Sequence, residues 1–267
     1  MKTFRTIAEM RKALDEPRLA GKRIGLVPTM GAFHDGHVAL MRAARERTDL
    51  TVVSLFLNPA QFTAADDLAR YPRDEKRDAK IAKKAGAHVL FAPTPEELYP
   101  HGFNTWVDPG ALALRLEGAA RPGHFRAVAT VCTKLFDIVH PDAAFFGRKD
   151  AQQLAVIRQV VRDLNLPVEI VPVPTVRDTD GLALSSRNAF LSPDERVSAA
   201  ALPRALQAGA QAYRSGADPV DAAHAVLRGM PELRVEYVEV AELDGPTLVA
   251  AVRVSSTRLI DNVPLSR

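Results

Sequence analysis

Short apolar segments alternate with segments of helical periodicity through the first two thirds of the chain. The apolar runs, which we interpret as strands, lie at 24–27, 50–57, 88–92, 143–146 and 168–173. Apolar side chains at helical spacing fill the stretches between them, at 38–47, 74–85, 126–139 and 151–164. Continuously apolar strands are typical of a parallel sheet buried on both faces, and helices of this length serve as its crossovers. The pattern predicts a doubly wound, Rossmann-like α/β domain over residues 1–175.

The N-terminal segment is predicted to be an amphipathic helix. Apolar residues recur at helical spacing from Phe4 to Leu14, and Thr6 and Glu9 are placed as a capping box. The segment lacks the apolar core of a signal peptide, and no apolar stretch of the chain approaches the roughly 18 residues of a membrane span. We therefore expect the segment to stay in the mature protein, and we expect no membrane partner.

The pattern changes after Arg187. An alanine-rich amphipathic helix is predicted over 193–213 and a second helix over 219–227, followed by strands at 235–240 and 253–260. The dipeptide of Gly245 and Pro246 marks a turn between the two strands and favours antiparallel pairing. These elements predict a small α+β domain over residues 176–267, reached through a connection at 173–187.

Four polar clusters follow four of the predicted strands. Residues 29–37 come after the first strand, 58–61 after the second, 147–153 after the fourth and 174–187 after the fifth. Ligands of open α/β sheets bind beyond the carboxyl ends of the strands. We therefore expect the four clusters to converge on one edge of the sheet and to form the binding site.

The first cluster, PTMGAFHDGH, places His34 and His37 three residues apart at a predicted helix start. This spacing puts both imidazoles on one face, and the unpaired N–H groups of a helix N-terminus favour a phosphate there. Gly31 and Gly36 permit a close approach of the backbone. The competing interpretation is a helix-capping turn with two surface histidines.

Amides and a lysine follow the second and fourth strands. Asn58 and Gln61 in FLNPAQF can hold hydroxyl or carboxylate oxygens, or the Asn-Pro pair can simply end the strand. In GRKDAQQ, Gly147 ends a strand, Lys149 can meet an anionic phosphate, and Gln153 lies one helical turn further on. A lysine at a helix start opposes the helix dipole, which favours a functional role over a solvated one.

The fourth cluster, TDGLALSSRN, presents Ser185, Ser186 and Arg187 after a glycine-containing turn. Two hydroxyls and a guanidinium can close over a polyphosphate, and the position at a predicted domain junction suits a lid. A plain interdomain linker is the alternative.

Charge and cysteine content restrict the classes of partner and the cellular location that we expect. Lysine and arginine exceed aspartate and glutamate by 35 − 32 = 3, and charged residues are 25% of the 267-residue chain. No long basic run accompanies this balance, so we expect no nucleic-acid partner, whereas a small anionic ligand fits. The single cysteine, Cys132, excludes an internal disulfide, and its place on an apolar helical face predicts burial rather than nucleophilic chemistry. The protein is therefore expected to be cytoplasmic.

Six motifs in this order and spacing resemble the pantothenate synthetase family: PTMGAFHDGH, FLNPAQF, RYPR, RPGHF, FFGRKDAQQL and PTVRDTDGLALSSRN. The resemblance covers residues 28–188, and its HxGH element is shared by a wider superfamily of nucleotidyltransferases. It implies an ATP-dependent ligase that joins (R)-pantoate to β-alanine through a pantoyl-adenylate and releases pyrophosphate and AMP. It also implies a requirement for Mg²⁺ and a homodimer.

The resemblance assigns an ATP site to residues that follow the first, fourth and fifth strands: Met30, Gly31, His34, His37, Gly147, Lys149, Asp150, Val176, Leu184, Ser185, Ser186 and Arg187. Four of these residues are expected to be catalytic: His37, His34, Lys149 and Arg187, with His37 as the proton donor. Pantoate and β-alanine are expected to contact three amides: Gln61, Gln153 and Asn58.

Three further positions match the family pattern, and two positions differ from it. Asp78 matches a position linked to magnesium, and Glu117 and Arg121 match positions near the active site. Leu184 stands where many members have methionine, a change that preserves side-chain volume. Arg148 replaces a residue that is often glutamate and adds positive charge beside the phosphate-binding lysine.

Two other functions fit part of the pattern. Another HxGH nucleotidyltransferase, which transfers AMP to phosphopantetheine or to a nicotinamide mononucleotide, needs no amine acceptor. A non-catalytic nucleotide-binding module needs Gly31 and Lys149 but neither Gln61 nor Gln153. Release of AMP that depends on β-alanine separates the ligase from both.

Overall fold

The computed structural model describes residues 1–62, 68–69, 71–230 and 232–266. Its chain forms two compact units: the first comprises Met1–Gly147 and Gln152–Val173, and the second comprises Arg148–Ala151 and Pro174–Arg267. The segment Arg148–Ala151, which the sequence pattern assigns to the first domain, is thus part of the second unit. Its hydrogen bonds with the last strand of the chain, described below, explain the difference.

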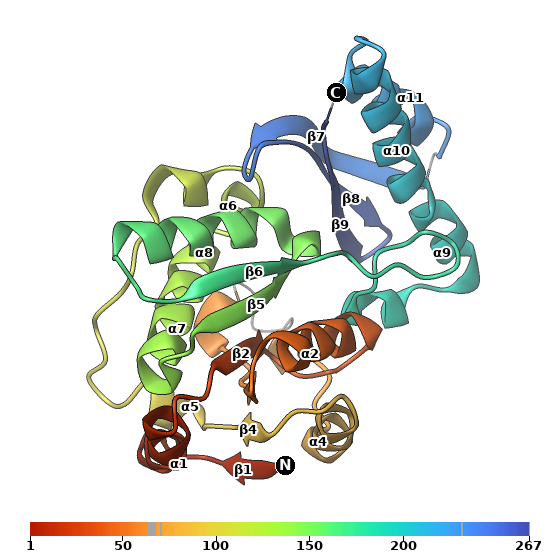
Figure 1. Ribbon diagram of the computed structural model, residues 1–267. Helices are drawn as coiled ribbons and strands as arrows, with labels where there is room; N and C mark the ends of the chain where they lie inside the picture. The colour runs from red at the N-terminus through yellow and green to blue at the C-terminus, as the bar shows by residue number, and fades with distance from the viewer. Residues whose placement is uncertain (63–67, 70, 231, 267) are drawn as a thin grey trace. The chain divides into compact units, whose positions relative to one another are not determined.

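Within the described residues, a parallel sheet of six strands forms the centre of the first unit, in the order β1-β4-β3-β2-β5-β6 (Figure 1). The strands are β1 (Lys2–Phe4), β2 (Ile24–Thr29), β3 (Leu50–Leu55), β4 (Val89–Phe91), β5 (Ala143–Gly147) and β6 (Glu169–Val173). Five of them lie where the apolar runs predict strands, and the doubly wound α/β fold is confirmed. The sequence pattern does not predict β1, because three residues show no period and the strand forms by pairing with β4.

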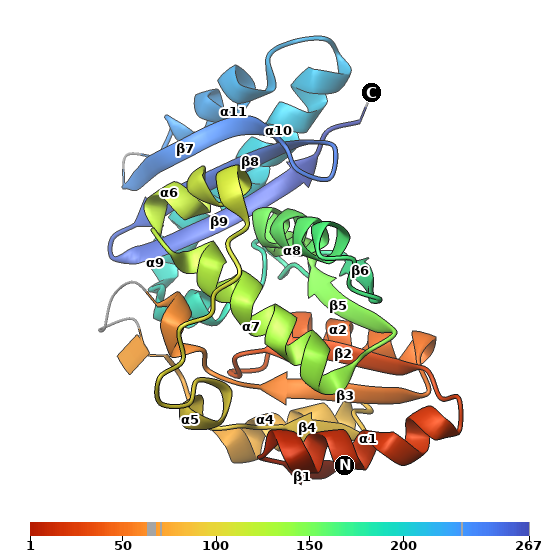
Figure 2. The ribbon, with the colours of Figure 1, turned by 90° about the vertical axis from the view of Figure 1, so that its left-hand side faces the viewer.

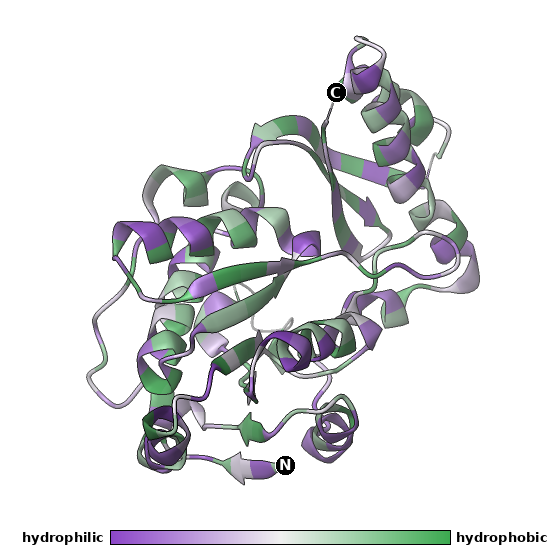
Figure 3. Cartoon of the chain, in the orientation of Figure 1, coloured by the Kyte–Doolittle hydropathy of each residue, from purple (hydrophilic) through white to green (hydrophobic). Residues whose placement is uncertain are grey.

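Helices cover both faces of this sheet (Figures 1 and 2). On one face, α1 (Ile7–Leu19), α7 (His124–Val139) and α8 (Ala151–Asp163) bury side chains such as Leu135 together with Leu26 of β2. On the other face, α2 (Asp35–Arg47) and α4 (Glu75–Lys84) pack Met41 and Ala82 against Val27 of β2. Figure 3 shows the same division by hydropathy: β4, β5 and β6 are mostly green, whereas α2 alternates between green and purple.

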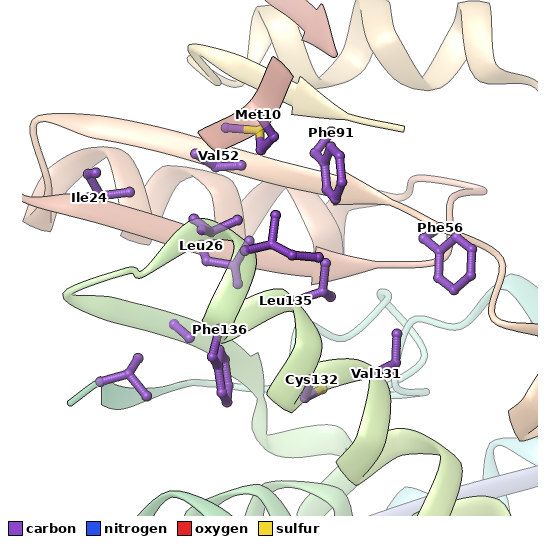
Figure 4. Close-up of a cluster of buried hydrophobic side chains, with 14 of the residues drawn as sticks. Met10, Ile24, Leu26, Val52, Phe56, Phe91, Val131, Cys132, Leu135 and Phe136 are labelled. Carbon is purple, nitrogen blue, oxygen red and sulfur yellow. The ribbon is translucent and has the colours of Figure 1, made fainter. Parts of the chain in front are cut away.

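Cys132 is a core residue, as its helical face predicts. Figure 4 shows it on α7 beside Val131, Leu135 and Phe136 in the cluster that also holds Leu26. The residue is 3% exposed, and burial raises the pKa of its thiol to about 12. The thiolate, which is the nucleophilic form, is therefore scarce at neutral pH.

The strand order of the sheet reverses between β2 and β5. From β2 the chain proceeds to β3 and β4 on one side, and it then returns to β5 and β6 on the other. The carboxyl ends of β3, β2, β5 and β6 lie at one edge, because each neighbouring pair among them is parallel. Open α/β sheets bind ligands at such a reversal, and the four polar clusters begin at this edge.

The second unit packs helices against an antiparallel sheet in the order β7-β8-β9. The strands are β7 (Leu233–Glu242), β8 (Pro246–Val254) and β9 (Thr257–Pro264), and the helices are α9 (Pro193–Ala199), α10 (Ala201–Arg214) and α11 (Pro219–Leu227). Leu206 of α10 and Leu227 of α11 are buried with Leu248 of β8 in a core of its own. Among the helices that the structure describes in either unit, none is long and apolar enough to cross a membrane.

Two predictions for the second unit are wrong. The helix predicted over 193–213 is divided at Ala200, which follows the end of α9 and precedes α10. The strand predicted over 253–260 spans the turn between β8 and β9, where Ser255 has a φ of 48°. The sequence hides β8 because Ala250 and Ala251, in its middle, have low strand propensity.

Candidate active site

His34 and His37 cap the N-terminus of α2. Nδ1 of His34 accepts the backbone N–H of Gly36 at 3.1 Å, and Nδ1 of His37 accepts the backbone N–H of His34 at 3.3 Å. The centroids of the two rings lie 4.2 Å apart. The capping turn and the phosphate site, which the sequence presents as alternatives, are therefore compatible, because the same side chains cap the helix and gather at its positive end.

These two hydrogen bonds fix the tautomers of both rings. A backbone N–H can only donate, so Nδ1 of each ring is the acceptor, and the proton of the neutral imidazole is on Nε2. Each Nε2–H lies across the ring from the capped backbone. Two such donors at the start of a 13-residue helix make a site suited to an anion.

Asp78 of α4 holds the loop that leads into α2. Its carboxylate accepts the backbone N–H groups of Ala32 at 2.8 Å and of Phe33 at 2.9 Å, and the residue is 1% exposed. Ala32 has a φ of 54°, a conformation that side chains other than glycine adopt rarely. Hydrogen bonds to an ionised group are strong, and these two stabilise the unusual backbone. Asp78 thus shapes the chain just before His34.

Gly31 and Gly36 are needed for different reasons. Gly31 has a φ of 95°, and a Cβ there would lie 2.8 Å from Cδ1 of Leu55 and 3.0 Å from Oδ2 of Asp78. A Cβ at Gly36 would lie 2.8 Å from Cε1 of His34. Glycine at both positions lets the loop approach Asp78 and lets the His34 ring fold back on the helix start.

Asn58 and Gln61 form an amide pair after β3. Asn58 precedes the 3-10 helix Pro59–Gln61, and its Oδ1 accepts the backbone N–H of Ala60 at 3.3 Å. Nδ2 of Asn58 donates to Oε1 of Gln61 at 3.0 Å, and the NH₂ group of Gln61 donates to the thioether of Met30 at 3.0 Å. Because sulfur is a weak acceptor, this NH₂ group can exchange it for a carboxylate or hydroxyl oxygen.

Two side chains of the RPGHF motif hold the backbone carbonyl of Gln61. Nδ1 of His124 donates to it at 2.9 Å, and Nη2 of Arg121 donates to it at 3.2 Å. Nε2 of His124 accepts from Nη1 of Arg121 at 3.2 Å, because a guanidinium can only donate. His124 is therefore the neutral Nδ1–H tautomer, the opposite of the neutral form of His34 and His37. Arg121 acts on the main chain of the amide pair.

Tyr99 belongs to this site, and the sequence analysis misses it. Its hydroxyl donates to Oδ1 of Asn58 at 2.9 Å, and burial raises the pKa of this phenol well above its ordinary value. Its ring stacks on Trp106, with centroids 6.3 Å apart, and meets the edge of Phe103 at 5.0 Å. Tyr99 follows the four-residue helix α5 (Pro95–Leu98), and no motif or period marks it in the sequence.

Gln152 of α8 fastens the segment before α6 (Glu117–Ala120). Its Nε2 donates to the carbonyls of Leu112 and Arg115, each at 2.8 Å, and its Oε1 accepts the backbone N–H of Glu117 at 3.0 Å. Gln153, the expected pantoate contact, comes next and is partly buried on the first turn of α8. Gln152 thus anchors the segment before α6, and Gln153 is the candidate contact for pantoate.

In the second unit, Lys149 lies in the 3-10 helix Arg148–Asp150 between β5 and α8. Its Nζ is 3.7 Å from Oδ1 of Asp150, and its side chain is 20% exposed. Nη1 of Arg148 is 3.9 Å from Oδ2 of Asp244. The extra charge of Arg148 is therefore partly offset by a carboxylate.

Val176 and Leu184 face each other across a short hairpin of the second unit. The N–H of Leu184 donates to the carbonyl of Val176 at 3.0 Å, and the next pair of residues, Arg177 and Ala183, forms an antiparallel bridge. Arg196 of α9 fastens the tip of the hairpin by donating to Asp178 at 2.6 Å and to Asp180 at 2.8 Å. Two residues expected at the ATP site are thereby neighbours.

The serine and arginine segment after this hairpin is ordered by its own hydrogen bonds. Oγ of Ser185 accepts the N–H of Arg187 at 3.3 Å and begins the 3-10 helix Ser186–Phe190. Nδ2 of Asn188 donates to the carbonyl of Ala183 at 3.0 Å. The segment is a folded turn rather than an extended linker.

Asp78 does not fit a resident magnesium site. Both of its oxygens accept backbone N–H groups, and the part of the chain that the structure describes has no group of three or more His, Cys, Asp or Glu side chains that could hold a metal ion. Mg²⁺ in kinase and ATPase sites keeps several waters and is bound largely by the substrate's phosphates. The Mg²⁺ that the resemblance implies would therefore enter with ATP rather than occupy a site of its own.

Met30 joins the histidine loop to the amide pair. It follows β2 directly, and its thioether contacts the amide of Gln61 after β3. Tyr71 of the RYPR motif donates to the carbonyl of Gly31 at 3.5 Å, whereas Arg70 of the same motif lies outside the described residues. The first two polar clusters therefore meet at this edge of the sheet.

Comparisons with known proteins agree along the whole chain. A family profile described as pantoate-beta-alanine ligase matches residues 2–264. The chain is 52% identical to pantothenate synthetase 1 of Bradyrhizobium diazoefficiens, a match that covers 100% of this chain and 99% of that protein. It is 49% identical to the pantothenate synthetase of Moorella thermoacetica, over 99% of each chain.

Solved structures show the same similarity. Pantothenate synthetase from Thermus thermophilus matches with a TM-score of 0.93 and 44% identity, covering 100% of both chains. Pantoate-beta-alanine ligase from Francisella tularensis, in complex with beta-gamma ATP and β-alanine, matches with a TM-score of 0.85 and 30% identity, covering 99% of this chain and 97% of that one. Since the profile and the relatives match over nearly the full length, the chain belongs to the pantoate–β-alanine ligase family.

Proposed function

We propose that the protein joins pantoate to β-alanine at the expense of ATP, giving pantothenate, AMP and pyrophosphate through a pantoyl-adenylate. The observation that carries the proposal is the pair of Nε2–H donors that His34 and His37 present at the start of α2. They follow β2, at the sheet edge where the strand order reverses. Membership of the pantoate–β-alanine ligase family supports the same reaction.

The first step makes mainly electrostatic demands. The carboxylate of pantoate is ionised at neutral pH, and its oxygen attacks the α-phosphorus of ATP. A bond from the carboxylate oxygen to phosphorus forms, and the bond to pyrophosphate breaks. Two anions meet in this step, so N–H donors and cations lower its barrier. We assign this task to His34 and His37, and the neutral His37 would act through its Nε2–H as a hydrogen-bond donor to the phosphates.

Cationic side chains are proposed to act in the same step. We assign the triphosphate to Lys149 and to the turn that contains Ser185, Ser186 and Arg187. Val176 and Leu184, which are paired across the hairpin, are assigned to the nucleotide. These assignments follow the motifs, and the hydrogen bonds that order the turn from Ser185 to Arg187 support them.

Pantoate is assigned to the amide pair. Gln61 has an NH₂ group whose acceptor is the thioether of Met30, and a carboxylate or hydroxyl oxygen is a stronger acceptor. Asn58 fixes the orientation of that amide by donating to its oxygen. Gln153 is the second proposed contact.

The second step forms the C–N bond. The neutral amine of β-alanine attacks the acyl carbon of the adenylate, the bond from that carbon to the phosphate oxygen breaks, and AMP leaves. The amine has a pKa of roughly 10, taking lysine as the nearest reference, so it must lose a proton before it attacks. The requirement for an amine acceptor distinguishes this reaction from simple adenylyl transfer.

Three expectations from the resemblance accompany this function. Mg²⁺ is proposed to be required as the companion of ATP, and its omission should abolish turnover. A homodimer is proposed, which sedimentation velocity tests. A cytoplasmic location is also proposed, which fractionation of the source cells tests.

The function is tested by offering the purified protein ATP, Mg²⁺ and pantoate, with and without β-alanine, and identifying the products by mass. The ligase is expected to release pantothenate and AMP in steady turnover only when β-alanine is present. AMP transfer to phosphopantetheine or to a nicotinamide mononucleotide would favour another HxGH enzyme. ATP binding without turnover would favour a nucleotide-binding module. Reactions without pantoate control for ATP hydrolysis.

A further inference from the structure

Two adjacent polar residues of β9 are buried in the second unit. Asp261 is 3% exposed and Asn262 is 7% exposed. Consecutive residues of a strand point to opposite faces, so the two side chains meet different neighbours. Buried polar groups need hydrogen-bond partners, and both residues find them in segments that are assigned to the nucleotide.

Asn262 binds the main chain around Lys149. Its Nδ2 donates to the carbonyl of Lys149 at 2.8 Å and to the carbonyl of Arg148 at 2.9 Å. One amide thus holds two successive carbonyls of the 3-10 helix Arg148–Asp150. The ammonium of a lysine is at the end of a long flexible side chain, so the position of the lysine backbone determines which groups the ammonium can reach. Asn262 fixes this starting point.

Asp261 holds the second segment, the hairpin that begins at Val176. Its carboxylate accepts from Nη1 of Arg177 at 2.6 Å and from Nη2 at 3.0 Å. Nη1 of Arg177 also donates to the carbonyl of Gly181 at 3.1 Å, in the turn of the hairpin. Oδ1 of Asp261 accepts the backbone N–H of Asn262 at 2.8 Å. An arginine that makes two hydrogen bonds to one carboxylate fixes the relative orientation of the two side chains. The pair of Arg177 and Asp261 therefore fixes the part of β9 that carries Asn262.

We propose that Asn262 is a positioning residue for Lys149, setting the backbone of the 3-10 helix so that the lysine meets the phosphates of ATP. The inference rests on the proposed function, because it takes Lys149 as a phosphate-binding cation. Asn262 acts through Lys149, so its effect ends once pyrophosphate has left. Adenylate formation depends on Asn262, and the reaction of the adenylate with β-alanine does not.

The two half-reactions separate this role from general support of the fold. Asn262→Ala is expected to slow pantoate-dependent exchange of pyrophosphate into ATP by about tenfold, the scale of losing two hydrogen bonds. Its reaction of preformed pantoyl-adenylate with β-alanine is expected to change by less than about twofold, because that step involves no pyrophosphate. In a Lys149→Ala background, Asn262→Ala is expected to add less than about twofold, because the two residues act as one unit.

Controls make the outcome decisive. Asn104→Ala, at an exposed position, is expected to leave both rates unchanged. Asn262→Asp keeps the shape but lacks the donors, and it replaces the alanine variant if that variant does not fold. Equal slowing of both half-reactions would contradict the proposal. A further tenfold slowing of exchange when Asn262→Ala is added to Lys149→Ala would also contradict it, as would failure of both Asn262 variants to fold. Absence of exchange in the unaltered protein would instead contradict the proposed function.

Discussion

The hydroxyl of Tyr99 donates to Oδ1 of Asn58 at 2.9 Å and thereby helps to orient a second amide that lies beyond Asn58. Nδ2 of Asn58 donates to Oε1 of Gln61, so the NH₂ group of Gln61 is turned outward from the pair. Burial raises the pKa of the Tyr99 phenol, so the hydroxyl remains a donor throughout the neutral pH range. A phenol therefore helps to decide which end of Gln61 is offered to a ligand.

Replacement of this phenol is expected to weaken pantoate binding selectively. Tyr99→Phe should raise KM for pantoate by roughly two- to tenfold, the scale of one lost neutral hydrogen bond, and leave KM for ATP within about twofold. The phenylalanine keeps the ring contacts with Trp106 and Phe103. Steady-state kinetics with each substrate varied in turn measure both constants. Tyr213→Phe, on α10 of the second unit, is the matched control. An equal rise in both KM values would assign Tyr99 to the fold alone.

His37→Ala is expected to slow adenylate formation by roughly a hundredfold, the scale of removing one transition-state donor. The variant also loses the hydrogen bond that Nδ1 of His37 accepts from the N–H of His34, which costs about 1 kcal/mol of unfolding free energy and leaves the protein folded. Pyrophosphate exchange and urea unfolding measure the two effects. His101→Ala, at an exposed position, is the control. Exchange near the rate of the unaltered protein would remove His37 from the chemistry.

Asp78→Asn is expected to destabilise the protein without altering its use of magnesium. The amide retains one acceptor and turns its NH₂ group toward the N–H of Ala32 or Phe33, a loss of roughly 2–3 kcal/mol of unfolding free energy. The Mg²⁺ concentration for half-maximal exchange should stay within about twofold, because the ion is proposed to enter with the phosphates of ATP. Urea unfolding and a magnesium titration check both statements. A large shift of the magnesium midpoint at unchanged stability would restore Asp78 as a metal ligand.

Cys132→Ser is expected to leave both half-reactions unchanged. A hydroxyl buried in this apolar cluster should lower the free energy of unfolding by about 1–3 kcal/mol. The thiol, with a pKa of about 12, should be alkylated only after the protein unfolds. Iodoacetamide labelling with and without urea measures its access. Rapid labelling of the folded protein with loss of turnover would revive a nucleophilic role.

Buried elements can be predicted from the sequence when they are long enough to show a hydrophobic period. The capping box of Thr6 and Glu9 forms at the start of α1 as its spacing predicts, because both partners are local. The three residues of β1 and the alanines of β8 give no such signal. Those strands exist because of what they pair with, which a local pattern does not contain.

The same distinction holds in the candidate site. His34 and His37 are three residues apart, so their shared face can be predicted from spacing alone. Tyr99 reaches Asn58 across 41 residues, and Asn262 reaches the carbonyl of Lys149 across 113. Only the fold brings such pairs together. Local spacing in the sequence therefore indicates candidate ligand-binding groups, whereas the distant residues that hold those groups in place become visible only in the fold.

The order of the two steps follows from the substrates. Pantoate brings its own ionised nucleophile, so adenylate formation needs no amine. Exchange of labelled pyrophosphate into ATP is therefore expected to require pantoate and Mg²⁺ but not β-alanine, because reversal of the first step alone regenerates ATP. Exchange that occurs only with β-alanine would mean that the two steps are not sequential.

Arg187→Ala is expected to separate these steps. Its N–H is held by Oγ of Ser185, and its guanidinium is assigned to the triphosphate. The variant should depress pyrophosphate exchange by roughly tenfold or more, since charge-assisted hydrogen bonds to phosphate are among the strong ones. Reaction of preformed pantoyl-adenylate with β-alanine should fall far less, because that step carries no pyrophosphate for the guanidinium to meet. Arg204→Ala, exposed on α10, is the control for loss of one positive charge. Equal losses in the two half-reactions would show that Arg187 supports the fold or the adenylate rather than the departing pyrophosphate.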